Sequence, residues 1–165
     1  AVEPDGEGPI LTTEQCLLNP NRNPSMSAEQ IERAVANGLG AEKVLWVTEG
    51  LLNDHTDGHI DTIARFVAPG RVVCMAPSGD DDPNRDVLDR IAGELAAMTD
   101  ARGRKLEVVR IPSPGRVLDE DGEVMPASFV RPRLTPALFL TIARNLRRSP
   151  DLSVGKLLTM ARIFG

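Results

Sequence analysis

Short apolar runs alternate with amphipathic segments along the first two thirds of the chain. Each run is four to six residues long and is bounded by turn-forming residues, which is the pattern of a buried strand. The segments between some of the runs place apolar residues three and four positions apart, the spacing of one helical face. We therefore predict an α/β fold built of short units. The predicted strands are residues 10–13, 43–47, 62–67, 71–75 and 106–111.

Two helices and one hairpin join these strands. Ser27 stands three residues before Gln30, the spacing of a capping box, and predicts that a helix begins there. Asp82 and the proline after it predict the start of a second helix, which we expect to end near Gly103. Gly70 separates two of the strands and predicts a hairpin in which glycine supplies a positive φ. The expected order is strand, helix, strand, hairpin, helix, strand.

The pattern changes near residue 128. Segments 134–148 and 152–164 permit helices but do not continue the earlier order. Residues 129–165 hold seven basic side chains and one acidic side chain, in a chain whose net charge is −5. A change of charge along a chain can mark a segment with a different role. We predict a folded domain over 1–128 and a divergent basic tail over 129–165, either helical or poorly ordered.

The composition is that of a folded globular domain, with 41% hydrophobic and 26% charged residues. No apolar run approaches the ~20 residues that cross a bilayer, and the first residues are acidic, unlike a secretory signal. We therefore expect a cytoplasmic protein without a membrane partner. The negative charge gives no reason to expect a nucleic acid partner and suits a cationic small molecule better. Cys16 and Cys74 form no paired-cysteine motif, and we interpret both as buried structural thiols.

Five blocks of the sequence, taken in order, resemble one family of enzymes. Their spacing is also similar, which makes the match far more specific than a single motif. Over about residues 3–128 the chain is similar to the bacterial agmatine deiminases and peptidylarginine deiminases. The blocks are residues 7–24, 39–47, 50–51, 57–61 and 64–70.

The resemblance implies a fold and a reaction. Members of this family are pseudo-symmetric β/α propellers of the pentein type, built from repeated strand and helix units around a substrate cavity, and this chain would supply some of those units. They hydrolyse a guanidinium group to a ureido group and ammonia, through a cysteine thiouronium intermediate and without a cofactor. The implied substrate is a small guanidinium such as agmatine, or a peptidyl arginine, which places the reaction in arginine and polyamine metabolism.

The candidate catalytic groups lie in the segment 56–61. Asp61 is a carboxylate, the natural clamp for a planar cation with N–H donors in a fixed fork. His59 titrates near neutrality, so it can give a proton to the departing ammonia and take one from the attacking water. In an extended segment both side chains point to the same face. Asp57 either shapes the turn with Gly58 or contacts the substrate.

Other interpretations of the same residues stay open. His55 and His59 are four residues apart among aspartates and would suit a divalent metal in a helix, although Gly58 argues against one. The family's glycine-rich segment that ends in histidine and cysteine does not occur here, and Cys16 and Cys74 do not match the nucleophile position. We therefore expect a truncated and inactive deiminase chain, or a guanidinium-binding or partner-binding module that self-associates through unpaired propeller edges. A change of reading frame near residue 129 would account for the basic tail.

Overall fold

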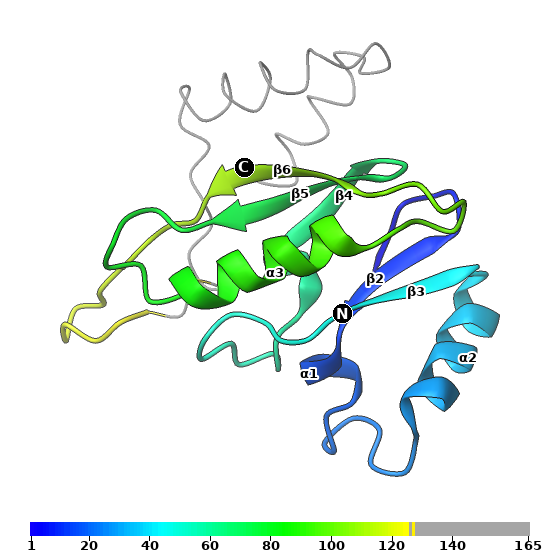
Figure 1. Ribbon diagram of the computed structural model, residues 1–165. Coiled ribbons are helices and arrows are strands. Elements are labelled where there is room, and N and C mark those ends of the chain that lie inside the picture. Colours follow the sequence, from blue (N-terminus) through cyan, green and yellow to red (C-terminus); the bar gives the residue numbers. More distant parts are fainter. Residues whose placement is uncertain (126, 128–165) are drawn as a thin grey trace.

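The computed structural model describes residues 1–125 and 127 (Figure 1). The basic tail and its two predicted helices lie outside these residues and stay predictions. Within the described part of the chain, no helix has the length and apolar character needed to cross a bilayer. The strands are β1 (Glu3–Pro4), β2 (Pro9–Thr13), β3 (Lys43–Val47), β4 (Ala64–Ala68), β5 (Arg71–Ala76) and β6 (Glu107–Pro112). The helices are α1 (Glu14–Leu17), α2 (Ala28–Leu39), α3 (Arg85–Ala97) and the short 3-10 helix η1 (Ile60–Thr62).

Two three-stranded sheets repeat one arrangement. The first sheet has the order β1-β2-β3, with β1 antiparallel to β2 and β2 parallel to β3. The second has the order β4-β5-β6, with the same antiparallel and parallel pairs. A helix lies in each crossover from the second strand to the third, α2 in one unit and α3 in the other. The α/β class and the predicted hairpin are confirmed, whereas closure of such units into a propeller stays a prediction.

The main core lies between α3 and the sheet that it crosses (Figure 1). Leu88, Ile91 and Leu95 recur three and four positions apart and are fully buried. They pack with Val72 and Cys74, alternate residues of β5 that point to one face of the sheet. The apolar face of the helix and the apolar face of the strand therefore form one buried layer.

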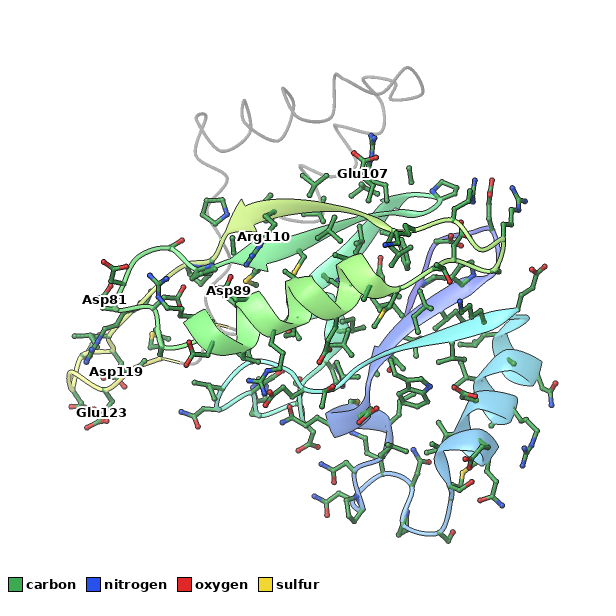
Figure 2. All side chains as sticks on the ribbon, viewed as in Figure 1. Asp81, Asp89, Glu107, Arg110, Asp119 and Glu123 are labelled. Atoms are coloured by element: carbon green, nitrogen blue, oxygen red, sulfur yellow. The ribbon has the colours of Figure 1, made fainter. Side chains whose placement is uncertain are left out.

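An ion pair also joins α3 to β6. Figure 2 shows Arg110 of β6 beside Asp89 of α3, and the Arg110 Nη1 donates a hydrogen bond to Asp89 Oδ1 at 2.9 Å. Both side chains are partly exposed, so the pair contributes at most about 1 kcal/mol. Apolar packing remains the main source of stability for this unit.

The two long helices match their predicted starts to different degrees. The capping box of α2 is present, since Ser27 Oγ accepts from the Gln30 N–H at 3.3 Å and Gln30 Oε1 accepts from the Ser27 N–H at 2.7 Å. The helix α3 is shorter than predicted at both ends, since it begins after Asp82 and ends before Gly103. Asp100 is the reason at the second end, because its carboxylate accepts two backbone N–H groups of a turn that returns the chain to β6.

Two leucine substitutions should differ greatly in their effect on the free energy of unfolding, because only one of the leucines lies in the core. Leu88→Ala leaves a cavity under α3 and should lower the free energy of unfolding by about 3 kcal/mol. Leu118→Ala is the matched control, since Leu118 is 50% exposed and its loss should change stability by less than about 0.5 kcal/mol. Urea unfolding monitored by circular dichroism compares the two. Equal losses would contradict this description of the core.

Candidate active site

His59 lies at the end of a loop that follows β3 and has no regular structure before η1. Three backbone N–H groups in the first half of this loop, those of residues 48, 50 and 52, each donate to a side chain from another segment. The loop is therefore fixed by side chains in place of a neighbouring strand. The acceptors, in the same order, are Glu94 Oε2 at 3.0 Å, Gln15 Oε1 at 2.7 Å and Asn84 Oδ1 at 2.8 Å.

Asp54 holds the second half of the loop. Its buried carboxylate accepts from the Thr56 N–H at 3.0 Å and from the His59 N–H at 3.2 Å, and the Thr56 hydroxyl bonds to it at 2.9 Å. Asp57 and Gly58 then adopt left-handed backbone conformations, with φ of 61° and 75°. Asp57 is thus a residue of the turn, as one of the two interpretations of the sequence predicted. Asp54 was not predicted to have this structural role.

His59 and Asp61 lie close together, as expected, but the predicted extended geometry is wrong. His59 Nδ1 is 3.7 Å from Asp61 Oδ1. The chain turns directly after His59, because residues 60–62 form η1 and the Thr62 hydroxyl donates to the His59 carbonyl oxygen at 2.8 Å. The two side chains therefore meet across a tight turn and not along one face of a strand.

Each member of this pair carries a buried polar atom without a hydrogen-bond partner in the described part of the chain. These atoms are His59 Nε2 and Asp61 Oδ1. Buried polar atoms are nearly always paired in folded proteins, so an unpaired one needs an explanation. The other carboxylate oxygen, Asp61 Oδ2, lies 3.4 Å from the Arg65 guanidinium. His59 Nε2 therefore has no hydrogen-bond partner among the described residues, and Asp61 Oδ1 has only longer contacts, with the Ala1 ammonium at 3.8 Å and with His59 Nδ1 at 3.7 Å.

The surroundings of His59 favour its neutral form. Burial lowers its pKa below the ordinary value, and the ammonium of Ala1 and the guanidinium of Arg22 act in the same direction. The carboxylates of Asp61 and Asp54 oppose this change. The net direction is downward, so the imidazole is neutral at pH 7 and is able to accept a proton.

A small cavity borders the carboxylate of Asp61. Its volume is about 20 Å³, enough for a single water molecule. Arg65 contributes a charged wall, and the side chains of Val73, Met75 and Ile111 contribute an apolar wall from the second sheet. The cavity thus has a polar end at Asp61 and Arg65 and an apolar wall, and His59 does not line it.

The two cysteines are free and buried. Burial raises the pKa of both thiols, that of Cys74 to about 11. A thiol is a nucleophile only as the thiolate, and both are protonated at neutral pH. The prediction that Cys16 and Cys74 are buried is therefore confirmed.

The metal-binding alternative fails on geometry. It required a helix that would place His55 and His59 on one face, but the residues between them form a turn with two left-handed conformations. Across residues 1–125 and 127, no three side chains of histidine, cysteine, aspartate or glutamate are gathered closely enough to hold a metal ion.

Comparison with known proteins gives one consistent result. Residues 1–133 match the model of the Porphyromonas-type peptidyl-arginine deiminases. The agmatine deiminase of Pseudomonas aeruginosa (strain LESB58) is 44% identical over 115 residues, which cover 70% of this chain and 31% of that protein. This chain spans about a third of the length of the curated relatives it matches.

Solved structures give the same result for the fold. An agmatine deiminase of Enterococcus faecalis aligns with a TM-score of 0.68 and 36% identity, covering 75% of this chain and 34% of that one. The C315S agmatine deiminase of C. jejuni with substrate bound aligns with a TM-score of 0.63 and 28% identity, covering 74% of this chain and 36% of that one.

The two aspartates of the loop should respond differently to loss of charge. Asp54→Asn replaces one acceptor oxygen with an amide NH₂, which leaves a backbone N–H of the loop unpaired and should cost about 1–2 kcal/mol of stability. Asp57→Asn removes the same charge from a position where asparagine tolerates the left-handed backbone, and should change stability by less than about 0.5 kcal/mol. Urea unfolding, with amide exchange at His59, measures both. A larger effect of Asp57→Asn would contradict the role given to Asp54.

Cys74 should make stability depend on pH in the alkaline range. The unfolded thiol ionises near pH 8.5, whereas the folded thiol has a pKa of about 11. The folded state therefore holds the proton more tightly. This contribution is fully present below about pH 8.5 and is lost as pH rises toward 11. Urea unfolding across this range should show the loss, and Cys74→Ser should reduce it. If the free energy of unfolding falls with pH equally steeply in Cys74→Ser, Cys74 is not the source of the loss. Rapid alkylation of folded Cys74 at pH 8 would likewise show that the thiol ionises readily.

Proposed function

Because the chain belongs to the Porphyromonas-type peptidyl-arginine deiminase family, we propose that it binds a guanidinium group and takes part in the hydrolysis of that group to a ureido group and ammonia. In this proposal His59 carries protons and Asp61 clamps the guanidinium. The observation that carries it is that His59 and Asp61 lie together, and that His59 Nε2 and Asp61 Oδ1 are buried without a hydrogen bond among the described residues, with the Ala1 ammonium 3.8 Å from Oδ1.

The two oxygens of Asp61 differ in a way that suits a clamp. Arg65 holds Oδ2, while Oδ1 has no hydrogen-bond partner in the described residues. A guanidinium bound at Oδ1 would donate one N–H there and keep its plane set by that bond. The bound group would then lie beside His59, whose Nδ1 is 3.7 Å from Asp61 Oδ1. Binding thus aligns the group that loses ammonia with the group that moves protons.

His59 has the properties that the proton transfers require. In the proposed reaction the imidazole of His59 takes the proton of a thiol, the resulting thiolate attacks the guanidinium carbon, and the imidazolium gives that proton to the nitrogen that leaves as ammonia, which forms the thiouronium. The neutral imidazole then removes a proton from the water that attacks the thiouronium carbon, and breakage of the C–S bond releases the ureido product as the hydroxyl proton returns to the sulfur. Asp61 stabilises the imidazolium each time it forms. Because Cys16 and Cys74 are buried and protonated, neither is the thiolate of this proposal.

The substrate of this proposal is a guanidinium of the agmatine or peptidyl-arginine type. Agmatine is named in the relatives, and its two positive charges suit a chain with a net charge of −5. A cytoplasmic location belongs to the same proposal. Self-association through the sheet-edge strands β3 and β6 stays a prediction.

Titration with agmatine tests the proposal directly. We expect agmatine to shift the imidazole NMR signals of His59 with a Kd of roughly a millimolar, and Asp61→Asn to weaken binding by about fivefold, since a partly exposed ion pair contributes about 1 kcal/mol. Asp81→Asn is the matched control, because it removes the same charge from an exposed position before α3 and should leave the affinity unchanged.

The ureido product of agmatine is a second control. It has the same length but no positive charge on the reacting group, so it should bind more weakly than agmatine. The proposal is wrong if agmatine leaves the His59 signals unmoved at tens of millimolar, or if the two aspartate variants bind equally well.

A further inference from the structure

The loop before His59 is closed at its base by two glycines. The backbones of Gly50 and Gly58 approach so closely that a Cβ on Gly50 would lie 2.2 Å from the Gly58 Cα. No side chain fits in that space, so glycine is required at residue 50 for steric reasons. We call this contact between Gly50 and Gly58 the neck of the loop. His59 follows the neck directly, so the position of Gly58 fixes the backbone of His59 and, through it, the position of the imidazole.

Gln15 is seated against both sides of the neck. Its Oε1 accepts from the Gly50 N–H at 2.7 Å, and the same atom would lie 2.6 Å from a Cβ on Gly58. Its backbone N–H donates to the Thr48 carbonyl oxygen at 3.2 Å. One residue therefore bonds to the chain as it enters the neck and fills the space beside the chain as it leaves.

Thr13 is bonded to the other side of the neck, at Gly58. Its hydroxyl donates to the Gly58 carbonyl oxygen at 2.6 Å and accepts from the Cys16 N–H at 3.1 Å, which caps α1. Thr13 is the last residue of β2 and Cys16 lies in α1, and both are buried, so the start of α1 is fixed to the first sheet. The neck is thus attached to the sheet by two side chains from the segment 13–15.

We propose that Gln15 is a positioning residue for His59, which keeps the imidazole beside Asp61 by holding the neck of the loop. The proposal rests on the proposed function of His59. Gln15 is largely exposed, so its loss removes little apolar packing. Thr13 would still hold Gly58 in a Gln15 variant, and the fold should persist while the neck opens. The consequence is a change at His59 in a chain that remains folded.

Variants at Gln15 separate positioning from overall stability. Gln15→Ala removes the acceptor and the filled space, and should speed amide exchange at Gly50 by about fivefold, the change expected for one lost hydrogen bond. Water should then reach His59, and its pKa, followed by NMR without ligand, should rise toward the ordinary value. No charge changes in this variant, so Asp61, Asp54, Arg22 and the Ala1 ammonium act on His59 as before. Gln15→Glu keeps an acceptor oxygen and should restore the protection of Gly50.

Glu94→Ala is the matched control. It removes the acceptor of another N–H group in the same loop, at Thr48 and outside the neck, so it should leave the His59 titration unchanged. If Gln15→Ala fails to fold, Gln15→Met fills the same space without an acceptor and should still speed exchange at Gly50. A His59 titration that is unaltered in Gln15→Ala, or shifted equally in Glu94→Ala, would overturn the proposal.

Agmatine binding distinguishes this inference from the proposed function. If the unmodified chain does not bind agmatine, the proposed function fails, while the ligand-free titrations still show whether Gln15 positions His59. If agmatine binds and only Asp61→Asn weakens it, with Gln15→Ala like the unmodified chain in titration and exchange, the proposed function stands and the positioning role fails.

Discussion

The backbone N–H groups between β3 and η1 have no strand to pair with, and the candidate site depends on how they are satisfied. An unpaired buried N–H costs about 1–3 kcal/mol, so a loop that leaves several unpaired would not hold one conformation. In this loop, side chains accept the hydrogen bonds of these N–H groups. Gln15 comes from α1, Asn84 and Glu94 come from the α3 region, and Asp54 lies within the loop. The loop is therefore held between the two repeated units, and the place of His59 depends on both.

The charged side chains around His59 and Asp61 also connect the two units. Arg65 of β4 reaches both Asp61 and Glu3 of β1, so one guanidinium joins the two units beside the site. Burial raises the pKa of Glu3, and Arg65 opposes that change. Arg65 also shows what Asp61 offers to a ligand, since one carboxylate oxygen already faces a guanidinium and the other has no hydrogen-bond partner within the described residues. The protein thus contains its own example of the interaction proposed for the substrate.

Local pattern was enough to predict β2 to β6 and the start of α2, because the 2-residue and 3.6-residue periodicities and the Ser27 capping box act over a few neighbours. It missed β1, and it began β4 at residue 62, which lies in η1. It was not enough for the site. The turn after His59 is formed by side-chain bonds from Asp54 and Thr62, which override the extended conformation expected from alternation. The Asp54 signal was present in the sequence, since an aspartate two residues before a threonine favours an Asx turn.

Contacts that are distant in sequence could not be predicted in this way. Gln15 and Gly50 are 35 residues apart, and no local propensity links them. The close approach of Gly50 to Gly58 likewise follows from tertiary packing, although two glycines flanking a polar loop are compatible with it. The chemistry could be predicted more easily than the geometry, because hydrolysis of a guanidinium calls for a carboxylate and a histidine. The sequence thus pointed to His59 and Asp61, whose roles stay predictions, but not to the residues that hold them.

A crystal structure of this chain grown with agmatine is the most direct test of the proposed site. We expect a guanidinium nitrogen within hydrogen-bond distance of Asp61 Oδ1, His59 Nε2 facing the guanidinium, and Arg65 still on Asp61 Oδ2. Agmatine bound at another part of the chain would contradict the proposed site, as would protein groups that bond to both His59 Nε2 and Asp61 Oδ1 and leave no place for the ligand.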